Sequence, residues 1–261
     1  LAAVQALQKG PLTARQLDEV GISRATLDSL VKRGVLTASE QDKAIDLFAA
    51  IPFDPQPLEL SAEQQHVFDE LLPNLEDSRP HAALLHGVTG SGKTIVFLRL
   101  IQRTLELGRK ALVLVPEISL TPQMIQRLKS TFGSRLAVQH SALNNTERLL
   151  QWRMIQQGNA DIVVGTRSAV FAPLQNLGLI IMDEEQEHTY KSESAPRYDA
   201  HDVAKKRAVM ENALLLFASA TPLTETYHAA QSGKLQLVEL KHRYAAQLQQ
   251  ELSSLMQVYQ D

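Results

Sequence analysis

From about residue 82 onward, short runs of continuously apolar residues alternate with longer stretches that have the spacing of amphipathic helices. Strands that are apolar on both faces are typical of a parallel sheet covered by helices on both sides. The pattern therefore predicts an α/β fold built on a doubly wound parallel sheet. The expected strands are 82–86, 111–115, 136–139, 161–165, 177–182 and 213–218.

The first 50 residues follow a different pattern. Residues 13–20 have helical spacing behind a capping threonine, Gly21 introduces a turn, and residues 24–33 form a second amphipathic stretch that Gly34 ends. Residues 35–37 are candidates for a wing strand. The pattern favours a small winged-helix-like module at 1–50, with a plain helical hairpin as the alternative.

The remainder of the chain divides by composition. Residues 51–59 are rich in proline and predict a stiff linker. Residues 60–240 form the main domain, in which Ser61 can cap a helix that runs through Leu72. Residues 241–261 predict a helical tail. The chain begins without methionine, which suggests a fragment of a longer protein.

Composition narrows the class of protein. Of the 261 residues, 44% are apolar and 21% are charged, as in ordinary soluble proteins. No apolar run approaches the ~20 residues that span a bilayer, and the N-terminus lacks a signal peptide, so we expect a cytoplasmic protein without membrane contact. The absence of cysteine excludes disulfides and cysteine-ligated zinc. A net charge of −3 implies that any contact with DNA comes from a local patch.

The run 87–94 fits the pattern G-x-x-x-x-G-K-[ST] and lies between a predicted strand and a predicted helix. In that setting glycines let backbone N–H groups converge on phosphate oxygens, and the helix adds the positive end of its dipole. We therefore predict binding of a nucleoside triphosphate, against the alternative of an accidental Gly/Ser turn. The predicted phosphate contacts are Gly87, Thr89, Gly90, Ser91, Gly92 and Lys93, with the Thr94 hydroxyl on Mg²⁺.

Three carboxylates, Asp183, Glu184 and Glu185, follow the predicted strand 177–182 directly. They should emerge at the sheet's carboxyl edge, beside the phosphate loop. Asp183 can hold Mg²⁺, and Glu184 can orient or deprotonate the water that attacks the γ-phosphate. The predicted catalytic residues are Lys93, Asp183 and Glu184. The alternative is that the carboxylates only form a charged cap on the next helix.

The segment S-A-T-P at 219–222 follows another apolar strand and brings small hydroxyl residues to the same edge. The order phosphate loop, D-E-E-x and S-A-T resembles that of superfamily 2 helicases. Longer strings resemble the primosomal replication-restart helicases, over roughly residues 58–244. Those strings are LSAEQQ (60–65), GVTGSGKT (87–94), LVLVPEISLTPQ (112–123), GTRSAVFAP (165–173), DEEQ (183–186) and SATP (219–222).

The resemblance implies a RecA-like P-loop NTPase lobe of a bacterial, ATP-dependent 3′→5′ DNA helicase acting in DNA replication. Its implied partners are single-stranded or forked DNA, the primosome and single-strand-binding proteins. Gln64 would read the adenine, and Ser219 and Thr221 would couple nucleotide state to domain movement. The implied DNA contacts are Ser119, Thr121, Thr166 and Arg167 on the strand's track, and Tyr190, Lys191, Arg197 and Tyr198 in a DNA-sensing loop at 190–202.

Two departures from the resembled family bear on activity. Its sensing loop reads R-Y-H-A-R-D, whereas residues 197–202 read R-Y-D-A-H-D, which weakens the expected DNA contact. The family's second lobe, with a cysteine-rich zinc module and an arginine finger, has no counterpart in the sequence. We therefore expect this chain to bind Mg-ATP but to hydrolyse it slowly by itself. The alternatives are a DNA-binding module with a degenerate ATPase lobe, and another superfamily 2 motor of the RecG kind.

Overall fold

The computed structural model describes residues 12, 17–18, 21–37, 51–55 and 57–244. The chain divides into two compact units, Leu1–Lys43 and Ala44–Asp261. The predicted domain boundary near residue 50 and the predicted helical tail from 245 onward lie outside the described residues, so both stay predictions.

In the first unit, helix α3 (Arg24–Lys32) begins at Ser23, whose hydroxyl accepts a hydrogen bond from the Thr26 N–H. Gly34, with a φ of +69°, follows the end of the helix, and Leu27 belongs to a small core. The predicted second helix is thereby confirmed. The predicted wing strand is not formed at Val35 and Leu36, because the N–H groups of both residues bond back to the Leu30 carbonyl of α3.

In the second unit, seven strands form one sheet in the order β3-β4-β2-β5-β6-β1-β7, and every neighbouring pair is parallel. The predicted α/β class is confirmed, and the six predicted strands lie within one residue of those observed; β7 was not predicted. The strands are β1 (His81–Gly87), β2 (Lys110–Leu114), β3 (Leu136–Gln139), β4 (Ile162–Gly165), β5 (Leu177–Asp183), β6 (Leu214–Ser219) and β7 (Gln236–Leu240).

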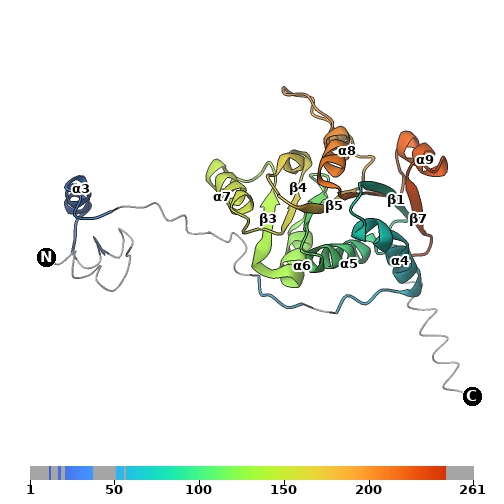
Figure 1. Cartoon of the computed structure of the whole chain (residues 1–261), viewed down its shortest axis with the longest axis horizontal. Coiled ribbons are helices and arrows are strands. Elements are labelled where there is room, and N and C mark those ends of the chain that lie inside the picture. The colour runs from blue at the N-terminus through green and yellow to red at the C-terminus, as the bar shows by residue number, and fades with distance from the viewer. Residues whose placement is uncertain (1–11, 13–16, 19–20, 38–50, 56, 245–261) are drawn as a thin grey trace, which may run out of the picture. The chain divides into compact units, whose positions relative to one another are not determined.

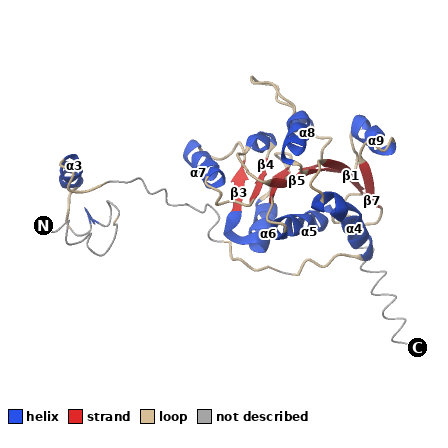
Figure 2. Ribbon diagram, in the orientation of Figure 1, coloured by secondary structure: helices blue, strands red, loops and turns tan. Residues whose placement is uncertain are grey.

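Helices cover both faces of this sheet (Figures 1 and 2). One face packs against α4 (Ala62–Glu76), α5 (Lys93–Glu106) and α6 (Pro122–Phe132), and the other against α7 (Asn145–Gln156), α8 (Ala200–Glu211) and α9 (Thr224–Gln231). Successive strand residues alternate between the two cores: Leu85 lies in the first and Leu84 in the second. A strand between these two cores therefore needs apolar residues at successive positions.

Shorter elements connect these layers. Single turns of 3₁₀ helix occur at η1 (Gly133–Arg135), η2 (Arg167–Phe171) and η3 (His188–Tyr190). Helix α4 begins at Ser61 as predicted and continues past Leu72 to Glu76. Among the described residues, no helix combines the length and the apolar character needed to cross a membrane.

Candidate functional site

The loop between β1 and α5 has the backbone that a phosphate-binding loop requires. Gly90 and Gly92 have φ angles of +81° and +82°, which side-chain-bearing residues rarely adopt. A Cβ at Gly92 would collide with the Gln64 amide, and one at Gly87 would lie 2.9 Å from the Ser91 hydroxyl. Helix α5 starts at Lys93 without a side-chain cap, so its first N–H groups are open to an anion.

Polar side chains around this loop fit a triphosphate. The Lys93 ammonium donates to the Gly87 carbonyl at 3.0 Å and lies 3.6 Å from a carboxylate oxygen of Glu184. The hydroxyl of Ser91 is buried and has no hydrogen-bond partner among the residues that the structure describes. An unpaired buried hydroxyl beside a lysine is suited to a phosphate oxygen.

The Gln64 side chain is hydrogen-bonded to the phosphate loop. Its side chain is completely buried; its amide nitrogen donates to the Ser91 carbonyl at 3.0 Å, and its amide oxygen accepts from the Ser61 N–H at 3.0 Å. Both polar atoms are therefore engaged within the protein. That it also reads adenine stays a prediction.

Replacing Gln64 by alanine is expected to lower the free energy of unfolding by about 1–3 kcal/mol, because the buried Ser91 carbonyl loses its donor. Urea unfolding followed by circular dichroism measures this. Gln65→Ala is the matched control, since the Gln65 side chain bonds to Asp69 on the exposed side of α4. Equal stability of the two variants would show that Gln64 does not hold the loop.

The acidic turn lies at the carboxyl end of β5, as predicted. Burial, with the neighbouring charge of Glu184, raises the pKa of Asp183 to about 6 against the opposing effect of Lys93. A buried carboxylate of this kind is stabilised by an adjacent cation. Within the described part of the chain, no group of three or more His, Asp and Glu residues is arranged for a metal. That Asp183 and Thr94 hold Mg²⁺ together with phosphate oxygens and water, the usual mode of this ion, stays a prediction.

A chain of hydrogen bonds joins this turn to β6. The Ser219 hydroxyl donates to the Gln186 amide oxygen at 2.6 Å, and the Gln186 amide nitrogen donates to Glu184 at 3.1 Å. The Thr221 N–H donates to the Ser219 hydroxyl at 2.8 Å. Sequence reasoning gave no role to Gln186, although its place in the D-E-E-Q run was a usable signal. The coupling role of Ser219 and Thr221 stays a prediction.

Glu185 differs from its two neighbours. Its side chain is completely buried, and its carboxylate accepts from the Leu223 N–H at 2.7 Å and the Thr226 hydroxyl at 3.2 Å. It faces the start of α9, so only Asp183 and Glu184 of the three carboxylates reach the phosphate loop.

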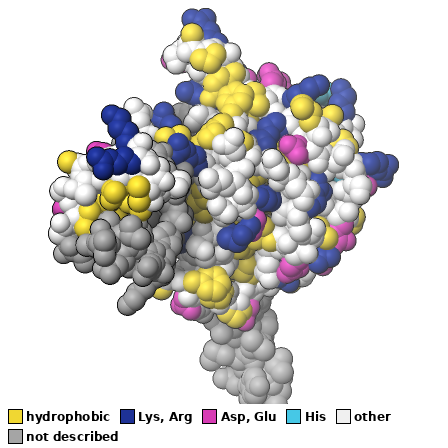
Figure 3. All heavy atoms as spheres, turned by 60° about the vertical axis from the view of Figure 1, so that its left-hand side comes forward, with side chains coloured by type: hydrophobic (Ala, Val, Ile, Leu, Met, Phe, Trp, Pro, Cys, Tyr) yellow, Lys and Arg dark blue, Asp and Glu magenta, His cyan; other side chains and the backbone are white. Residues whose placement is uncertain are grey.

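The first part of the predicted DNA track uses its backbone donors internally. The N–H groups of Ser119 and Thr166 donate to the carbonyls of Pro116 and Gln139, both at 3.0 Å. The Thr121 hydroxyl caps α6 by accepting from the Met124 N–H at 3.3 Å. Lys and Arg side chains are interspersed with Asp and Glu on the face drawn in Figure 3.

Arg167, the last residue of the predicted DNA track, is hydrogen-bonded to the sensing loop. One nitrogen of Arg167 donates to the carbonyls of Thr189 and Lys191, at 3.1 and 2.5 Å, and the guanidinium lies 5.8 Å from the centre of the Tyr198 ring. Arg197 is exposed and Tyr198 is half-buried, and contact of either side chain with DNA stays a prediction.

Tyr190 does not fit the predicted contact with a base. Its side chain is completely buried, and its hydroxyl lies 2.9 Å from the Leu114 carbonyl and 2.6 Å from the Asp183 carbonyl. A ring in this position links the ends of β2 and β5 and is not available for stacking. Lys191, by contrast, is exposed.

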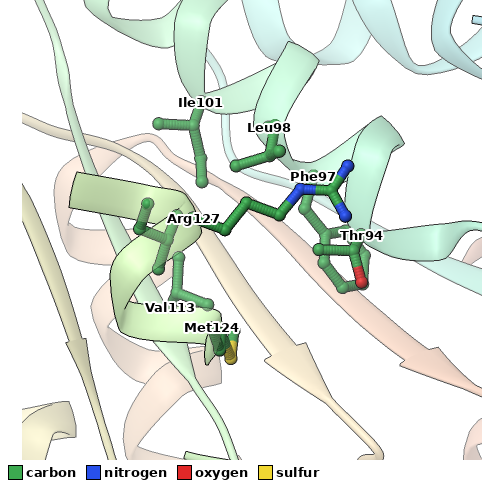
Figure 4. Close-up of a pocket in the computed structure, with 8 residues that line it drawn as sticks. Thr94, Phe97, Leu98, Ile101, Val113, Met124 and Arg127 are labelled. Carbon is green, nitrogen blue, oxygen red and sulfur yellow. The ribbon is translucent and has the colours of Figure 1, made fainter. Parts of the chain in front are cut away.

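A small cavity lies between α5, β2 and α6, with Arg127 and Thr94 at its wall (Figure 4). Its volume is about 20 Å³, enough for roughly one water molecule.

Comparisons with known proteins identify the family of this chain. The model of the DEAD/DEAH box helicase family matches residues 61–229, and the chain belongs to this family. It is similar to the Replication restart protein PriA of Bacillus subtilis (strain 168), with 45% identity over 88% of this chain and 29% of that protein. The same protein of Synechocystis sp. is 44% identical over 81% of this chain and 25% of its own length. The resemblance inferred from the motifs is confirmed.

The chain therefore spans less than a third of the length of these curated relatives. Among solved structures, that of RecG bound to a three-way DNA junction matches with a TM-score of 0.53 and 24% identity. The match covers 73% of this chain and 26% of that one, and it shows a shared fold.

Proposed function

We propose that this chain is the ATP-binding lobe of a replication-restart DNA helicase, which couples ATP hydrolysis to 3′→5′ movement along single-stranded DNA at stalled forks. The observation that carries the proposal is the 3.6 Å distance between the Lys93 ammonium and a Glu184 carboxylate oxygen, from two motifs 91 residues apart in sequence. The similarity to PriA proteins supports the DNA substrate.

Each residue of the site has a defined task in this proposal. Backbone N–H groups of the loop and the Lys93 ammonium bind the phosphates, and the Thr94 hydroxyl and Asp183 carboxylate hold Mg²⁺. The bound ion supplies positive charge that offsets the charge of the phosphates. Glu184 orients the attacking water and accepts its proton. Gln186 holds Glu184 in place and links it to Ser219.

The partners follow from the relatives. Single-stranded or forked DNA would bind along the edge that carries Arg167 and the sensing loop, through contacts to phosphate that do not read sequence. Primosomal and single-strand-binding proteins belong to the same proposal, as does a place in the bacterial cytoplasm.

Equilibrium titration of the chain with a fluorescent ATP analogue tests the proposal, with and without Mg²⁺. We expect Mg²⁺-dependent binding that unlabelled ATP displaces. An ATPase lobe that has degenerated into a DNA-binding module would show none, which would overturn the proposal. Steady-state hydrolysis with and without forked DNA follows, and we expect slow turnover by this chain alone.

A further inference from the structure

A second cluster of ionisable groups lies buried behind the acidic turn. The His201 ring has one nitrogen, Nδ1, 2.7 Å from a carboxylate oxygen of Asp199, and the other, Nε2, 2.8 Å from the Glu185 carbonyl. Nε2 is also 3.4 Å from the Glu185 carboxylate. The side chain of His201 is 7% exposed and that of Glu185 is 0% exposed. None of these three residues binds the phosphates in the proposed reaction.

The partners of His201 fix its protonation. A carbonyl oxygen and an ionised carboxylate only accept hydrogen bonds, whereas a neutral imidazole has a single N–H. Both ring nitrogens must therefore donate, and His201 is a cation between two carboxylates. Burial lowers its pKa, but hydrogen bonds to Glu185 and Asp199 outweigh this, so its pKa is raised above the ordinary value.

Aromatic rings complete the surroundings of His201. The Tyr190 ring meets it edge-on at 5.4 Å between centres, and the Phe217 ring stacks on it at 6.0 Å. Burial raises the pKa of Tyr190 well above 10, so that neighbour is uncharged. The charged groups facing the ring are thus Glu185 and Asp199.

The cluster joins four segments of the chain. Glu185 lies in the acidic turn next to Glu184 and receives the hydrogen bonds from the start of α9. Asp199 caps the start of α8 and pairs with Lys191 across the neck of the sensing loop, where the carboxylate lies 3.9 Å from the ammonium. A displacement of the sensing loop would therefore change the position of Asp199 relative to His201.

We propose that His201 is a positioning residue, a buried cation that fastens the loop between Lys191 and Asp199 to Glu185 and so transmits the state of that loop to Glu184. Burying His201 and Glu185 as charged groups, with Asp199 partly buried beside them, costs more than packing apolar residues of the same volume, so stability alone does not account for the cluster. The inference rests on the proposed function, in which the loop contacts DNA and Glu184 acts on ATP.

The experiment measures how much DNA changes nucleotide affinity. The chain is titrated with a fluorescent, non-hydrolysable ATP analogue and Mg²⁺, with and without single-stranded oligothymidine. In the unaltered chain we expect DNA to change the affinity by at least about fivefold, within the usual range of coupling between two sites. His201→Gln should reduce that factor to about one while the affinity without DNA stays within about threefold.

Two variants keep the test specific. His201→Arg retains a cation that cannot lose its proton, and it should retain the coupling. His66→Gln removes an exposed imidazole on α4, whose side chain is 73% exposed, and should change nothing. The coupling of the unaltered chain should decline as the pH rises through the raised pKa of His201, above about 6.5, and that of His201→Arg should not.

The outcomes separate this inference from the proposed function. Full coupling in His201→Gln would overturn the inference, as would nucleotide binding by the unaltered chain that DNA leaves unchanged. Should His201→Gln fail to fold, Thr226→Ala, which removes one hydrogen bond from Glu185, must weaken the coupling instead. A chain that binds no nucleotide at all would overturn the proposed function and the inference with it.

Discussion

Lys93→Ala is expected to weaken binding of Mg-ATP by about 10- to 100-fold, because a charge-assisted hydrogen bond contributes roughly 1.5–3 kcal/mol. In the structure this ammonium already lies at the mouth of the loop, held by the Gly87 carbonyl and by Glu184. Equilibrium titration with a fluorescent ATP analogue measures the loss.

The matched control is Lys234→Ala. Lys234 is exposed in the turn between α9 and β7 and contributes nothing to the proposed site. Its replacement should leave the affinity unchanged, and circular dichroism should show that both variants are folded. Unchanged ATP affinity in Lys93→Ala would mean that the nucleotide binds elsewhere.

Glu184→Gln should leave ATP binding intact and slow hydrolysis by about 10²- to 10⁴-fold, the usual contribution of a general base. The amide has the shape of the carboxylate and can keep the contact with Gln186. It cannot accept a proton from water. Since the substitution also removes the charge 3.6 Å from Lys93, affinity for the nucleotide should be equal or higher.

Hydrolysis is to be compared in a protein that carries both helicase lobes, with forked DNA present. Glu225→Gln is the control, because Glu225 is an exposed carboxylate in the first turn of α9. Full turnover by Glu184→Gln would show that another group activates the water.

The sheet and the phosphate loop could be predicted from sequence because their signals are local. A strand buried on both faces, such as β5, must be apolar at every position. The loop at 87–94 combines its glycines and lysine in one short segment. The edge strand β7 escaped prediction because it is only half-buried and includes Glu239.

The surroundings of the site could not be predicted, since they depend on contacts between distant segments. Tyr190 lies in a polar stretch that suggests an exposed ring, yet its hydroxyl bonds to the end of β2, 76 residues away in sequence. Glu185 cannot be told from Glu184 by composition. The turn of the backbone between them sends one carboxylate to the phosphate loop and the other to α9.

That turn has a practical consequence for engineering. Glu184 has a φ of +45°, a left-handed conformation that costs a residue with a side chain about 1–2 kcal/mol and glycine very little. A library screened only for resistance to heat or proteolysis should therefore enrich glycine at 184. The enriched variants would be more stable but would lack the carboxylate proposed to act on water. A screen for stability must therefore keep Glu184 unchanged or include ATP turnover among its criteria.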